Sequence, residues 1–144
     1  MKIYQLLIIL LLTFSIESIA QSNVGWRGPN RDGVYTETGL LKSWPSDGPE
    51  LLWAITDAGK GHSSPVISGN QIFVTGMDAE EKNEILTAYT LDGKKIYSVT
   101  YGPAWSKSYP DTRTTPTVAG DKVYVISGPG EVVCLNAADG KIIW

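Results

Sequence analysis

From residue 65 onward, hydrophobic residues occur in short runs separated by turn-forming glycine, asparagine and aspartate residues. The runs are rich in Val, Ile, Thr and Tyr, which is typical of half-buried strands. An Asp-Gly pair follows the third run of each group and supplies the positive φ angles that a tight hairpin needs. The pattern predicts two groups of four short strands, at residues 65–67, 71–75, 85–90 and 95–100 and at residues 116–118, 122–126, 131–135 and 141–144.

The two groups are copies of one another. Residues 64–74 align with residues 115–125 at a constant offset of 51, and residues 92–97 align with residues 139–144 at an offset of 47. The polar and acidic stretch 76–83 absorbs the difference in offset and is predicted to be a loop. Self-similarity at a fixed period indicates a repeat architecture, in which each copy is one structural unit.

Proline, glycine and aromatic residues recur at equivalent positions. An aromatic residue closes each copy, and Trp53 stands 44 residues before the first of them, Tyr97. Aligning Ala88 with Cys134 requires the turn after the third strand to be one residue shorter in the first copy. A β-sandwich would not repeat these residues in register, so the repeat predicts propeller blades. Its structural anchors are Trp53, Pro65, Gly69, Gly93, Tyr97, Pro116, Gly120, Gly140 and Trp144.

The predicted fold is an all-β propeller arc that is incomplete. It holds about two four-stranded blades, at residues 62–100 and 113–144, and residues 51–53 are expected to form an orphan outer strand. Propellers close with four to eight blades, and eight blades of about 45 residues would need roughly 360 residues. We therefore expect the chain to be part of a longer protein, or a truncated product of one, with the remaining blades missing from it.

The N-terminus has the pattern of a cleavable leader. Lys2 precedes an apolar stretch at residues 6–14, and a small residue, Ala20, ends the pattern. The apolar stretch is about half of the roughly 20 residues that a bilayer span needs. We expect a signal peptide at residues 1–20 with cleavage after Ala20, no transmembrane span, and a periplasmic or secreted protein. Residues 21–50 would then form an N-terminal segment before the repeats.

Composition narrows the choice of partner and of chemistry. The formal net charge is −3 without a block of like charge, which argues against a nucleic-acid surface. A single cysteine, Cys134, excludes an internal disulfide framework, and a single histidine, His62, excludes a multi-histidine zinc site. The acidic residues at positions 78–81 lack the spacing of a calcium-binding loop. Ser63 and Ser64 follow His62 without an acid in a triad-like pattern, so no hydrolase is predicted.

The chain resembles a known repeat family. Ser/Thr-Pro, then Gly, then Val-Tyr-Val, then the run at residues 135–144 (LNAADGKIIW) is similar to the propeller repeat of the pyrrolo-quinoline quinone (PQQ) type. Residues 26–33 (WRGPNRDG), 38–41 (TGLL) and 44–45 (WP) resemble the N-terminus of secreted bacterial members of that superfamily. The likeness covers the chain from about residue 25 to its last residue. It is specific for the fold and says little about activity, because function belongs to sites and not to folds.

The resemblance implies two functional classes. One class contains dehydrogenases that bind the quinone PQQ and calcium in the central funnel and oxidise alcohols or sugars. The other class has no cofactor and serves as a scaffold for other proteins, as in the outer-membrane protein assembly factor B type. The dehydrogenases typically carry a vicinal cysteine pair, and here Cys134 stands between Val133 and Leu135.

Meander topology predicts where a binding site would be. The longer connections, at residues 57–63, 76–83 and 101–114, emerge on one face, which we call the long-loop face. The opposite face carries only tight glycine turns. Binding residues concentrate on loops held by a rigid frame. On the long-loop face, His62 and Arg113 stand at equivalent positions before the innermost strand, where they face the funnel or bond neighbouring loop carbonyls.

Aromatic residues also gather in the third of these connections. Tyr101, Trp105 and Tyr109 are candidates for stacking on a sugar or covering a partner's surface, with packing against the adjacent blade as the alternative. The absent cysteine pair and the lack of a convergent catalytic set favour a non-catalytic, cofactor-free module that binds a protein or carbohydrate partner. The alternative is the N-terminal part of a PQQ- and calcium-dependent dehydrogenase.

Overall fold

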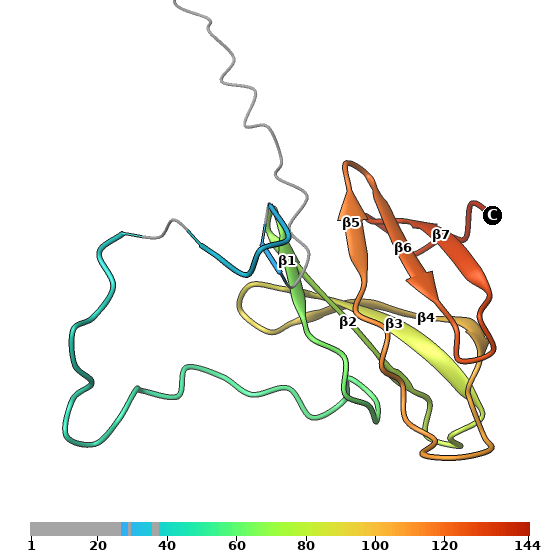
Figure 1. Ribbon diagram of the computed structural model, residues 1–144, viewed down its shortest axis with the longest axis horizontal. Helices are drawn as coiled ribbons and strands as arrows, with labels where there is room; N and C mark the ends of the chain where they lie inside the picture. The colour runs from blue at the N-terminus through green and yellow to red at the C-terminus, as the bar shows by residue number, and fades with distance from the viewer. Residues whose placement is uncertain (1–26, 29, 36–37) are drawn as a thin grey trace, which may run out of the picture.

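The computed structural model describes residues 27–28, 30–35 and 38–144. The expected leader at residues 1–20 and its cleavage point lie outside the described residues. No helix long and apolar enough to cross a membrane is found in the described part of the chain. The segment at residues 38–58 runs away from the sheets (Figure 1), and many of its large apolar side chains are exposed.

The all-β fold that the sequence predicts is confirmed. Two antiparallel sheets follow one another along the chain, and each is a meander in which neighbouring strands are consecutive (Figure 1). Two such sheets fit an incomplete propeller. The first sheet contains β1 (Val66–Ser68), β2 (Gln71–Met77), β3 (Asn83–Thr90) and β4 (Lys95–Pro103), and the second contains β5 (Thr117–Ala119), β6 (Lys122–Ile126) and β7 (Val132–Asn136).

The predicted fourth strand of the second copy, residues 141–144, pairs with β7 without becoming a full strand. Leu135 and Ile142 form an isolated antiparallel bridge, and the Cys134 amide donates to the Trp144 carbonyl at 2.8 Å. Ala88 pairs with Phe73, and Cys134 pairs with Tyr124, the residue 51 positions after Phe73. Ala88 and Cys134 are thus equivalent, and the turn from β3 to the Asp-Gly pair is one residue shorter in the first copy, as the repeat predicts.

The core lies between the two sheets and is drawn from both. β2 and β3 contribute Phe73, Leu86 and Ala88, while β6 and β7 contribute Val123 and Leu135, and all five are at most 1% exposed. Fully burying one such aliphatic or aromatic side chain is worth about 1.5–3 kcal/mol. The inner strands β1 and β5 also contact each other. The two units therefore share one hydrophobic core.

An aromatic ring on a glycine turn joins each unit to the next. A Cβ atom on Gly140 would lie 2.6 Å from the Tyr97 ring, and one on Gly93 would lie 3.0 Å from the Trp53 ring. Both glycines have positive φ angles, +74° and +80°, which L side chains rarely adopt. The Tyr97 hydroxyl also donates to the Ala137 carbonyl at 3.1 Å. The aromatic residue that closes one unit thus packs on the Asp-Gly turn of the following unit.

The orphan strand expected at residues 51–53 does not form here. Residues 51–53 have no regular pairing, and Leu51 and Leu52 are 78% and 80% exposed. Trp53 nevertheless makes the ring-on-glycine contact with Gly93. A strand needs a neighbouring strand for its backbone groups, whereas this contact needs only the glycine.

Replacing Gly140 by alanine should destabilise the protein by about 3 kcal/mol or more. The substitution adds the cost of a left-handed alanine, about 1–2 kcal/mol, to an overlap with the Tyr97 ring. Gly120 is the matched control, because it has φ +61° and no other atom lies within 4 Å of the place its Cβ would take. Gly120→Ala should be destabilised only by the cost of placing alanine in a left-handed backbone conformation. Denaturant unfolding of the full chain measures both, and equal losses would contradict the ring-on-glycine role.

Stability should fall at alkaline pH, in part because of Tyr97. Burial, with a smaller effect of the Asp139 carboxylate, raises the pKa of Tyr97 from 10.0 to about 12. The folded state favours the neutral phenol, so this contribution is intact below pH 10 and is lost as the pH rises toward 12. Tyr97→Phe should reduce the loss without abolishing it, since burial also raises the pKa of Tyr101. Unfolding free energies between pH 8 and 11.5 test this; an unchanged slope would refute it.

Candidate functional site

The longer connections converge on one face of the two sheets (Figure 1). Lys60 bridges to Met77 at the end of β2, and Gly61 bridges to Thr112 in the β4–β5 connection. The His62 amide donates to the Thr112 carbonyl at 2.7 Å. These backbone contacts tie the segment before β1 to both neighbouring connections, and together they form the long-loop face.

Four ionisable side chains interact across this face. Lys60 Nζ lies 3.2 Å from Glu81 Oε1 and 3.5 Å from Asp111 Oδ1, and His62 Nε2 lies 3.3 Å from Asp111 Oδ2. The hydrogen bond and charge of Glu81, ahead of Asp111, raise the pKa of Lys60. Exposed ion pairs of this kind contribute little to stability and are screened by salt. They connect three loops of the long-loop face.

The sequence did not indicate Asp111 as a partner of His62. The two residues are 49 positions apart, and only the fold brings the carboxylate to the imidazole. The Ser63 Oγ accepts a hydrogen bond from the Thr75 amide at 3.2 Å, which joins the loop before β1 to β2.

A cavity of about 310 Å³ opens beside this cluster. One wall comes from Glu84 at the start of β3, and the opposite wall comes from the turn after β6. The β4–β5 connection supplies the remaining wall. The lining residues are Glu84, Trp105, Asp111, Arg113, Thr114, Ser127 and Gly128.

Glu84 is the most buried charged residue of the cavity. Glu84 is 2% exposed, and its Oε2 accepts a hydrogen bond from the Tyr101 hydroxyl at 2.7 Å. Burial, followed by this bond, raises the pKa of Tyr101 well above the usual tyrosine range. Sequence reasoning missed Glu84. The available signal was its register, since residues 84, 86 and 88 alternate onto the same buried face of β3.

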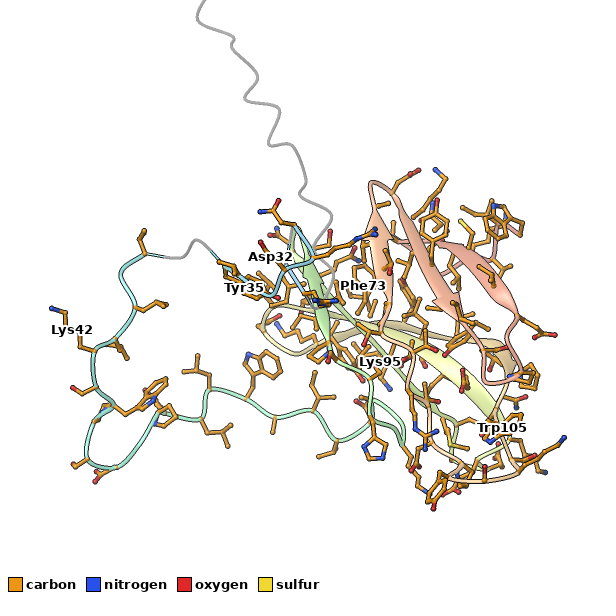
Figure 2. All side chains as sticks on the ribbon, in the orientation of Figure 1. Asp32, Tyr35, Lys42, Phe73, Lys95 and Trp105 are labelled. Carbon is orange, nitrogen blue, oxygen red and sulfur yellow. The ribbon has the colours of Figure 1, made fainter. Side chains whose placement is uncertain are left out.

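The aromatic candidates of the β4–β5 region go to three different places. Tyr101 is buried in β4, Trp105 lines the cavity, and Tyr109 is 80% exposed. Figure 2 places Trp105 at the long-loop end of the sheets, well away from Asp32. Its backbone lies so close to Gly128 that a Cβ there would be 2.5 Å from the Trp105 amide nitrogen. The Trp105 indole donates to the Ser108 carbonyl at 2.9 Å, which holds the ring in place.

Arg113 and His62, which the sequence places before the innermost strands, have different surroundings. Arg113 lines the cavity, and its Nη2 donates to the Tyr109 carbonyl at 2.8 Å. His62 is outside the cavity lining and pairs with Asp111 instead. Equivalent positions in the repeat therefore have different surroundings, because each lies against a different neighbour.

The described residues contain no group of three or more His, Cys, Asp or Glu side chains placed to hold a metal ion. Calcium takes six to eight oxygen ligands, whereas the cavity has two carboxylates beside the guanidinium of Arg113. One of these carboxylates, Asp111, already pairs with His62 and Lys60. The lining of this cavity therefore does not fit a calcium ion.

Comparison with known proteins identifies a family. The family model described as outer membrane protein assembly factor BamB matches residues 28–144. A search of the curated proteins found no match.

Replacing Tyr101 by phenylalanine should destabilise the fold by about 1.5–3 kcal/mol. The change removes a buried hydrogen bond to a carboxylate, and bonds to charged groups are worth that amount. Tyr109→Phe is the matched control in the same connection, because Tyr109 is 80% exposed and its hydroxyl has no hydrogen bond within the described residues. Its stability should not change. Thermal and denaturant unfolding test both variants; a loss in the control as large as that in Tyr101→Phe would show that the bond is not responsible.

Proposed function

Because the chain belongs to the family of the outer membrane protein assembly factor BamB, we propose that it is a non-catalytic binding or scaffold module whose long-loop face takes a partner molecule. A protein or a carbohydrate would suit the loops by chemistry alone. The family description concerns protein assembly, and this favours a protein partner over a carbohydrate. The proposed module uses no quinone and no metal ion.

The convergence of the longer loops around one cavity carries this proposal. Trp105 and Arg113 both line that cavity, and tryptophan and arginine are enriched where binding energy concentrates in protein interfaces. Both are tied to nearby carbonyl groups, so little side-chain freedom would be lost on binding. On the opposite face, the described strands are joined by tight turns, which offer few side chains to a partner.

Export is part of the same proposal. We expect the leader at residues 1–20 to be removed after Ala20 and the protein to be periplasmic or secreted. N-terminal sequencing of the protein purified from its source cell should begin at Gln21, and the protein should be found in the periplasmic or culture fraction. An intact Met1 on protein recovered from the cytoplasm would refute export.

Photo-cross-linking tests the binding face. A benzoylphenylalanine at position 109, which is 80% exposed in the β4–β5 connection, should form adducts with one protein in extracts of the source cell envelope. The same residue at position 70, in the turn between β1 and β2, is the control on the opposite face. Adducts at position 70 alone would place the interface elsewhere. Absence of protein adducts at position 109, with binding in a glycan array, would make the partner a carbohydrate.

A further inference from the structure

We propose that the cavity on the long-loop face receives one cationic side chain, a lysine or an arginine, from the protein partner, and that Glu84 binds its charged group. This inference rests on the proposed function and names the chemistry of its partner. It follows from a buried carboxylate that is only partly satisfied, from the charge around it, and from the aromatic wall beside it.

Glu84 is a buried residue whose carboxylate is only partly hydrogen-bonded. Burying a carboxylate is costly unless hydrogen-bond donors or a cation compensate it. Here Oε2 accepts the bond from Tyr101, whereas Oε1 accepts no hydrogen bond from any described residue, and Glu84 lines the cavity. Asp111 Oδ1, by contrast, already has Lys60 Nζ at 3.5 Å, so the unmet acceptor of the cavity is Glu84 Oε1. A ligand that donates a hydrogen bond would therefore suit this site.

The charge of the lining selects a cation among such ligands. The cavity has two carboxylates, Glu84 and Asp111, and one guanidinium, Arg113, so its lining carries one net negative charge. The charged neighbours of the lining are Lys60 with Glu81, Lys107 at the Trp105 ring and Glu131 at Ser127. They add two charges of each sign and leave that balance unchanged. An incoming ammonium or guanidinium group would neutralise the site. An anion would instead add to the repulsion around a carboxylate that water reaches poorly.

The size and wall of the cavity fit a single long side chain. A volume of about 310 Å³ is at the lower end of the range for small-ligand pockets. Trp105 lines one side, and an aromatic face attracts a cation within about 6 Å of its centroid. The ring already has this interaction with Lys107, whose Nζ lies 5.6 Å from the ring centroid. A lysine or arginine of the partner would also bury its apolar stem in the cavity.

The cavity is lined by residues of both units, so a bound side chain should affect the stability of the protein. Glu84 comes from the first sheet, while Ser127 and Gly128 follow β6 in the second. A side chain bound between them contacts both units, and a ligand that binds only the folded state stabilises it. Occupation of the cavity should therefore raise the melting temperature of the full chain.

Binding of capped amino acids to the full chain tests the inference. The probes are N-acetyl-lysine methylamide and N-acetyl-arginine methylamide, with N-acetyl-norleucine methylamide as the uncharged control and maltose as a carbohydrate. Amide NMR shifts of Ser127 and Gly128 and the Trp105 indole signal report on the cavity. We expect the two cationic probes to shift these signals with millimolar affinity and to raise the melting temperature, and the norleucine probe and maltose to leave both unchanged.

Variants of two glutamates identify the anchor. Glu84→Gln should weaken the cationic probes at least about tenfold, while its amide oxygen can still accept the Tyr101 hydroxyl. Glu80→Gln, in the exposed β2–β3 loop, is the matched charge control and should bind as the unchanged protein does. If Glu84→Gln fails to fold, Glu84→Asp, which keeps the charge and retracts it by one methylene, should fold and bind more weakly.

The outcomes separate this inference from the proposed function. Cationic probes that bind Glu84→Gln as well as the unchanged chain, or that do not bind at all, would overturn the cation site. Maltose shifting the same signals in their place would make the cavity a carbohydrate site. Protein adducts at position 109 with no probe binding would leave the proposed function standing and remove only this inference.

Discussion

The contact between a closing aromatic ring and the glycine of the next unit is the constraint on which the arrangement of the sheets depends. Tyr97 leaves the outer strand of the first sheet, covers Gly140 and bonds the Ala137 carbonyl. The contact positions the turn after β7 of the second sheet against the outer strand of the first. With that relation fixed, Phe73 and Leu86 of one sheet meet Val123 and Leu135 of the other in a shared core.

The same relation brings the two sheets together, and their inner strands β1 and β5 contact each other. The Gly61–Thr112 bridge joins the connections that precede these two strands. The cavity on the long-loop face lies at the boundary between the two sheets. Its lining combines residues of two connections, β4–β5 and β6–β7, with Glu84 at the start of β3.

Local pattern was sufficient for the fold and insufficient for the site. The strand order, the hairpin turns and the phase of Ala88 with Cys134 follow from period, propensity and repeat, all of which act over a few residues. The pairing of His62 with Asp111 depends on how two connections cross, and no pattern along the chain encodes that distance. Glu84 could have been recognised as a carboxylate in a core-facing register, but its pairing with Tyr101 needed the register of β3 against β4.

The ring-on-glycine contact also has a consequence for cooperativity. Because the closing aromatic residue of one unit contacts the turn of the next, the free energy of the array divides into a term for each unit and a coupling term for each boundary, as in a one-dimensional lattice. A change in the Tyr97 ring therefore acts on the coupling term between two units and lowers the cooperativity of their unfolding.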